Sequence, residues 1–202
     1  MRLLVIAFMV FAMSPIANAD FVEFDFAGNA GAGLLPGNEV GDNTSLGSDS
    51  TAFGGEVGGG LIFDASTNVL DVNFSFEGLD GGLLFDAASG IHLHLPPVAG
   101  DPFNQTGPVV FNLNSFDDAA VTNFNSQILD GATSGSISAQ VDFSNNLDLV
   151  DDLFAGEFYL NIHSQNFSGG ELRGSLTAVP EPSSMALLGL AMSAGVMIRR
   201  RK

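Results

Sequence analysis

The stretch Leu70-Asp71-Val72-Asn73-Phe74-Ser75-Phe76-Glu77 alternates an apolar with a polar residue at every position. Side chains along a β-strand point to opposite faces in turn, so this period of two predicts a strand with one buried and one wet face. The same alternation recurs over 22–26 and over 137–143. Three such segments in one chain favour an antiparallel sheet.

Five further strands are predicted from short apolar runs separated by Gly, Asn and Asp turns, at 59–64, 91–95, 109–113, 158–163 and 171–177. The stretch Leu147–Ala155 spaces its apolar residues at a roughly helical interval and predicts one short helix. The Gly- and Asn-rich stretch Ala27–Ser50 has little periodicity, so we expect a long loop there. About eight short strands predict an all-β fold, a single antiparallel Greek-key β-sandwich.

The beginning of the chain has the pattern of an export signal. A charged start is followed by the uninterrupted apolar run Leu3–Met13, and then by small residues at Ala17-Asn18-Ala19, where a signal peptidase reads. We therefore predict a secretory signal peptide over 1–19, cut by signal peptidase before Asp20. The β domain is expected over 20–178, and 179–202 forms a separate tail.

The tail contains Pro180-Glu181-Pro182, the apolar stretch Met185–Ile198 and a basic end, Arg199–Lys202. The apolar stretch predicts a short transmembrane helix whose basic end stays cytoplasmic. In this order, the three parts resemble the PEP-CTERM sorting signal of Gram-negative bacteria. The resemblance implies inner-membrane tethering, cleavage near the triplet by an exosortase, and release to the outer surface or an exopolysaccharide matrix. A permanent inner-membrane anchor is the alternative.

Charge and composition exclude several classes of function. The net charge is −17, and all but one of the 23 acidic residues lie within 20–178, where Arg173 is the only lysine or arginine. A domain this acidic repels phosphate backbones, which argues against a nucleic-acid partner. Cysteine is absent, which excludes thiolate catalysis and cysteine metal sites. Neither a Gly-x-Ser-x-Gly elbow nor a phosphate-binding glycine motif is present, so no catalytic residue and no enzyme activity are predicted.

The three histidines are the candidate metal ligands. His92 and His94 are two residues apart and share one face of a predicted strand, and His163 ends another strand. A His-x-His pair with a distant third histidine is a three-nitrogen arrangement suited to Zn²⁺ or Cu²⁺. The alternative is that these side chains hydrogen-bond to loops, while Arg173 pairs with a carboxylate such as Glu171 or Glu157.

Calcium is a second, weaker candidate ion. The acidic pairs Asp117-Asp118 and Asp151-Asp152 are oxygen donors that could bind Ca²⁺ weakly, although neither fits the EF-hand loop pattern. Solvated turns are the alternative interpretation.

Three segments carry a second resemblance: GIHLHL at 90–95, GPVVFNL at 107–113 and GEFYLNIHSQNFSGGELRGS at 156–175. They resemble the CHRD domain, which is named after repeats in chordin and is found in bacterial exported proteins. The most specific part contains Tyr159 and Asn161, followed by Glu171 and Arg173. The resemblance implies an extracellular β domain that acts as an interaction module.

Together these observations predict an exported, non-catalytic protein of the cell surface or extracellular matrix. Its CHRD-like domain would bind an extracellular protein or polysaccharide. The alternative function is a Cu- or Zn-binding β-sandwich that uses His92, His94 and His163.

Overall fold

The computed structural model describes residues 20–41, 45–84, 90–96, 101, 103–113, 118–122 and 130–180. The predicted signal peptide and the tail beyond Pro180 therefore lie outside the described residues. Within the described part of the chain, no helix is long and apolar enough to cross a membrane.

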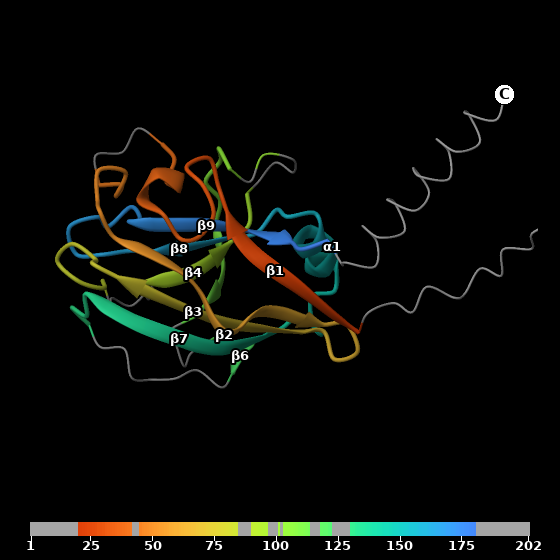
Figure 1. Cartoon of the computed structure of the whole chain (residues 1–202). Helices are drawn as coiled ribbons and strands as arrows, with labels where there is room; N and C mark the ends of the chain where they lie inside the picture. Colours follow the sequence, from red (N-terminus) through yellow and green to blue (C-terminus); the bar gives the residue numbers. More distant parts are fainter. Residues whose placement is uncertain are drawn as a thin grey trace, which may run out of the picture.

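The described residues form nine strands that hydrogen-bond side by side in one sheet, in the order β5-β4-β8-β9-β1-β2-β3-β7-β6 (Figure 1). Every pairing in the sheet is antiparallel. The strands are β1 Phe21–Ala27, β2 Phe53–Asp64, β3 Val69–Glu77, β4 Ile91–His94, β5 Val109–Asn112, β6 Val121–Thr122, β7 Ser134–Asp142, β8 Tyr159–Ile162 and β9 Leu172–Ala178. One α-helix, α1 (Asp148–Phe154), lies between β7 and β8.

The sheet curls until it is nearly barrel-shaped, and the core lies inside the curl. Phe143, directly after β7, makes ring contacts with Phe111 of β5 at 5.1 Å and with Phe63 of β2 at 6.0 Å between centroids. The contact with Phe111 joins β5, at one end of the sheet order, to the chain after β7, next to the other end, across one phenylalanine-rich core. The predicted all-β antiparallel fold is confirmed, with the two facing halves belonging to one continuous sheet.

All eight predicted strands and the short helix are present, and two features differ from the prediction. The two-residue strand β6 is additional. Strand β2 begins at Phe53 rather than near residue 59, because its first half is glycine-rich and has no apolar alternation to detect. A register irregularity between Glu56 and Leu61 separates that half from the rest of β2, and Gly58 and Gly60 there adopt positive φ angles.

The described residues of the predicted loop 27–50 have a definite place against the sheet. It contains a short 3-10 helix, Pro36–Asn38, and it forms isolated bridges from Leu35 to Arg173 and from Leu46 to Gly170. The loop therefore covers part of β9 and of the turn before it. Strands β4 and β8 are buried on both faces, whereas β1, β3 and β7 keep one more exposed face.

Candidate metal centre

The sheet register brings the three histidines together. Strand β4 pairs with β8 so that His92 lies opposite Asn161 and His94 opposite Tyr159. His163 directly follows β8 and lies two residues beyond Asn161. Alternation along each strand puts all three imidazoles on the face opposite to Leu93, Leu160 and the core. This face is covered, since His92 and His94 are only 4% and 8% exposed.

The imidazoles are close enough that they could hold one metal ion. One candidate ligand atom from each histidine lies within 4.8 Å of the other two. The ring centroid of His92 lies 5.3 Å from that of His94 and 4.9 Å from that of His163. Two nitrogens that bind one tetrahedral zinc at ~2.0–2.1 Å lie about 3.3 Å apart. Small side-chain rotations toward the ion would close the difference.

Backbone carbonyls orient two of the three rings. The Nδ1 atom of His94 lies 2.9 Å from the carbonyl oxygen of Gly107, and the Nδ1 atom of His163 lies 2.8 Å from that of Ser168. A carbonyl only accepts, so each Nδ1 carries a proton, and in the neutral imidazole each Nε2 then keeps its lone pair. Metal-binding histidines are typically held in this way, with the second ring nitrogen bonded to a carbonyl or carboxylate.

The environment keeps His94 neutral. Burial lowers the pKa of His94 to about 4; the hydrogen bond to Gly107 opposes this shift, and the nearby His92, His163 and Arg173 add to it. The imidazole is therefore deprotonated at neutral pH, which is the form that binds metals. Its Nε2 atom is buried and makes no hydrogen bond to a described residue.

A stack of three side chains borders the cluster. The ring of His94 lies parallel to that of Tyr159 at 4.8 Å, and the guanidinium carbon of Arg173 lies 3.5 Å from the centroid of the Tyr159 ring. Because β8 lies between β4 and β9, the imidazole and the guanidinium approach the ring from opposite sides. Burial raises the pKa of Tyr159 and lowers that of Arg173.

The same stack holds the loop before β5 over the cluster. The Tyr159 hydroxyl accepts a hydrogen bond from the Gly107 N–H at 2.9 Å, and Arg173 donates to the carbonyl oxygen of Gln105 at 2.7 Å. Asn29 donates to Asn104 at 2.7 Å, so the loop after β1 meets this loop. The two loops bury the polar face that the sequence pattern alone left open.

Glu39 is the residue that the sequence reasoning missed. It follows the 3-10 helix in the covering loop and is only 8% exposed. Burial raises the pKa of Glu39 to about 8, although the positive charge of Arg173 opposes that shift. Glu39 is thus an acidic group whose charge acts on Arg173, in addition to the expected candidates Glu171 and Glu157. No pattern in this part of the sequence signals it.

The other predicted site residues have separate places. Glu171 is fully buried and accepts hydrogen bonds from the backbone N–H of Asp80 and the hydroxyl of Ser50. Asp118 uses both carboxylate oxygens on backbone N–H groups, of Asn112 and Ala120, which is the geometry of a turn. Asp151 and Asp152 lie on α1.

Of the sorting triplet, Pro180 is exposed. The remaining predicted residues, Asp117, Glu181 and Pro182, lie outside the described residues.

The fold and the cluster define a class: antiparallel β domains with a buried polar face and no recognisable catalytic constellation among the described residues. Residues 32–176, more than half of the chain, match the family model of the CHRD domain, and residues 178–202 match the PEP-CTERM protein-sorting motif. The chain belongs to the CHRD domain family. No curated protein and no solved structure matches it. Neither matched family is known as a family of enzymes.

The sorting motif establishes the route of the protein. A chain with this motif is exported, processed by an exosortase at the membrane and displayed at the cell surface of a Gram-negative bacterium.

Proposed function

We propose that this chain is a non-catalytic surface protein whose CHRD domain binds a divalent transition-metal ion at His92, His94 and His163. The observation that carries the proposal is the convergence of one ligand atom from each histidine within 4.8 Å. In His94 and His163 a backbone carbonyl accepts a hydrogen bond from Nδ1, which leaves Nε2 on the other side of the ring as the candidate metal ligand. Imidazole nitrogens favour Zn²⁺ and Cu²⁺ over the oxygen-seeking Ca²⁺ and Mg²⁺.

We also propose that two cleavages define the mature protein. Signal peptidase would cut before Asp20, and the exosortase near Pro180, which leaves 20–178 as the mature domain. Its destination would be the outer surface or the exopolysaccharide matrix. The N–H of Val179 donates a backbone hydrogen bond of 2.8 Å to the carbonyl oxygen of Glu23, so the two ends of the sheet lie together near both expected cleavage points, which supports this division.

The test is the metal content of the exported protein. We expect about one equivalent of Zn²⁺ or Cu²⁺ after dialysis, measured by plasma mass spectrometry, and a loss of nearly all of it in the double variant His92→Ala/His94→Ala. Asn73→Ala/Ser138→Ala is the matched control, since these side chains bond to each other at 2.7 Å on another part of the sheet. Equal, substoichiometric metal in all three proteins would exclude this site.

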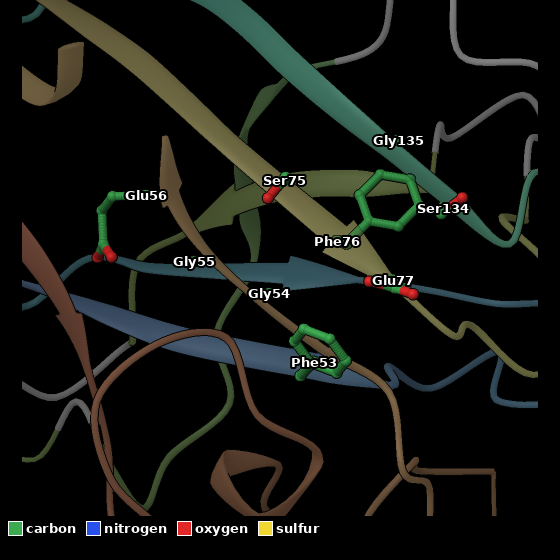
Figure 2. A pocket seen from close by; sticks show the side chains of 9 residues that line it. All are labelled: Phe53, Gly54, Gly55, Glu56, Ser75, Phe76, Glu77, Ser134 and Gly135. Atoms are coloured by element: carbon green, nitrogen blue, oxygen red, sulfur yellow. The ribbon is translucent and has the colours of Figure 1, made fainter. Parts of the chain in front are cut away.

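A second candidate function is favoured by a groove at the start of β2. The groove has a volume of about 530 Å³ and lies over Gly54, Gly55, Ser75 and Gly135. Figure 2 shows the ring of Phe53 and the carboxylate of Glu77 beside it. Phe53 is 54% exposed, so the face of its ring is open to a ligand in the groove. An aromatic face with nearby carboxylate and hydroxyl groups fits a neutral polysaccharide, and the acidic domain would repel an anionic one.

Pull-down from the extracellular matrix of the producing bacterium tests this second candidate. We expect the exported protein to retain polysaccharide, and Phe53→Ser to lose most of that retention because the ring no longer covers the sugar. Phe21→Ser is the control, since Phe21 is also exposed, at 62%, on a different part of the sheet. Retention that a protease abolishes would show a protein partner instead, and equal retention by both variants would remove the groove from consideration.

A further inference from the structure

Asn161 lies in the middle of the covered polar face. It pairs with His92 on β4 and with Arg173 on β9. Tyr159 and His163 flank it along its own chain, two residues away on each side. Directly opposed side chains in an antiparallel pair have Cβ atoms about 4.5–5.5 Å apart. The Asn161 carboxamide is therefore a direct neighbour of the histidine cluster.

This carboxamide is buried and incompletely bonded. Asn161 is only 4% exposed, and its Oδ1 atom makes no hydrogen bond to any described residue. Leaving a buried polar oxygen without a partner destabilises the fold unless a ligand or water satisfies it. Its position is also constrained, since a Cβ added to Gly170 would come within 2.6 Å of both terminal atoms of the amide. The fold thus holds the Oδ1 atom of Asn161, buried and without a hydrogen bond to a described residue, on the face that carries the three imidazoles.

We infer that Asn161 supplies the fourth, oxygen ligand of the metal site, either directly or through the water bound to the ion. This inference rests on the proposed function of the histidines. Three imidazole nitrogens and one neutral oxygen complete the four-coordinate set that Zn²⁺ prefers and also suit Cu²⁺. The same donor set disfavours Cu⁺, which selects sulfur ligands. Asn161 would therefore complete the ligand set that the three imidazoles begin.

The experiment compares Zn²⁺ affinity, measured by competition with a chelator, in the exported protein and three variants. Asn161→Leu keeps the volume of the side chain and removes the oxygen, and we expect affinity to fall about 10-fold or more. Asn161→Asp keeps an oxygen at the same place and adds charge, so its affinity should equal or exceed that of the native protein. Asn73→Asp, on β3, is the control for added charge alone and should leave the affinity unchanged.

The outcomes distinguish the role of Asn161 from that of the three histidines. The visible absorption band of bound Cu²⁺ should shift in Asn161→Leu, because the ligand set changes, and stay in place in Asn73→Asp. If the native protein binds Zn²⁺ and Asn161→Leu binds it equally well, this inference is wrong while the histidine site stands. If Leu and Asp variants weaken binding alike, Asn161 has a structural role only. If the native protein binds no ion, the inference is overturned together with the proposed function.

Discussion

Among single residues, Glu39 shows how strongly a covering loop can change the chemistry of a side chain. In the unfolded chain it is an ordinary carboxyl group in a loop sequence. In the folded protein it lies beside the Arg173–Tyr159 stack, and burial raises its pKa from 4.5 to about 8. The folded state therefore binds a proton on Glu39 more tightly than the unfolded state does.

The sign of the resulting pH dependence follows from this. The contribution of Glu39 to stability is fully present below pH 4.5 and is lost as the pH rises through about 8. Glu39→Gln cannot ionise, so its free energy of unfolding should exceed that of the native protein by about 4–5 kcal/mol at pH 9, and by no more than about 1 kcal/mol at pH 5. Denaturant unfolding at the two pH values measures this. The exposed Glu23→Gln is the control, and parallel pH profiles for all three proteins would contradict the assignment.

The histidines show how far residue patterns alone could lead. Alternation along two predicted strands placed His92, His94 and His163 on polar faces, and the structure brings them together. Whether β4 and β8 are neighbours depended on the order of the sheet, which no local pattern encodes. Metal binding itself stays a prediction. The orphan oxygen of Asn161 could not be found from the sequence, because it depends on which hydrogen bonds the loops leave unmade.

At the scale of elements, the aromatic contacts around Phe143 hold the curled sheet closed. Its ring packs edge-on against those of Phe63, Phe111 and Phe158, with centroids 5.1–6.0 Å away. These partners come from β2, from β5 and from just before β8. Edge-on aromatic pairs add about 0.5–1.5 kcal/mol each beyond the area that they bury.

Phe143→Ala should therefore destabilise the fold by about 3–5 kcal/mol, because it leaves a cavity where distant strands meet. Chemical denaturation followed by circular dichroism gives the free energy of unfolding. The control is Phe21→Ala on β1, where the ring is 62% exposed, and we expect a loss below about 1 kcal/mol. Similar losses in both variants would mean that Phe143 does not close the sheet.

The elements themselves were largely predictable, and the exceptions have physical reasons. Strands with alternating polarity, such as β3 and β7, are specified by their own residues. The first half of β2 is not, since glycine carries no hydrophobic signal and its pairing with β3 supplies the order. The loop 27–50 gains its structure from contacts with β9 that are distant in sequence. Local patterns predicted strands, and long-range pairing decided what covers them.

At the scale of the whole molecule, charge and location fit together. Residues 20–178 include all but one of the 23 acidic residues and a single arginine, which is itself only 1% exposed. The outer surface of the domain is consequently almost free of positive charge. Such a surface keeps displayed copies apart by mutual repulsion and concentrates cations around them.

The pairing of β1 with β9 has a mechanical consequence. Phe24 lies opposite Ala178, so the chain enters and leaves the domain at adjacent points of the same sheet. A tether at either end of the chain would therefore attach to the same border of the sheet. Tension on either tail then acts on one short border rather than across the core. Each tail can be cut in turn without pulling a strand out of the sheet.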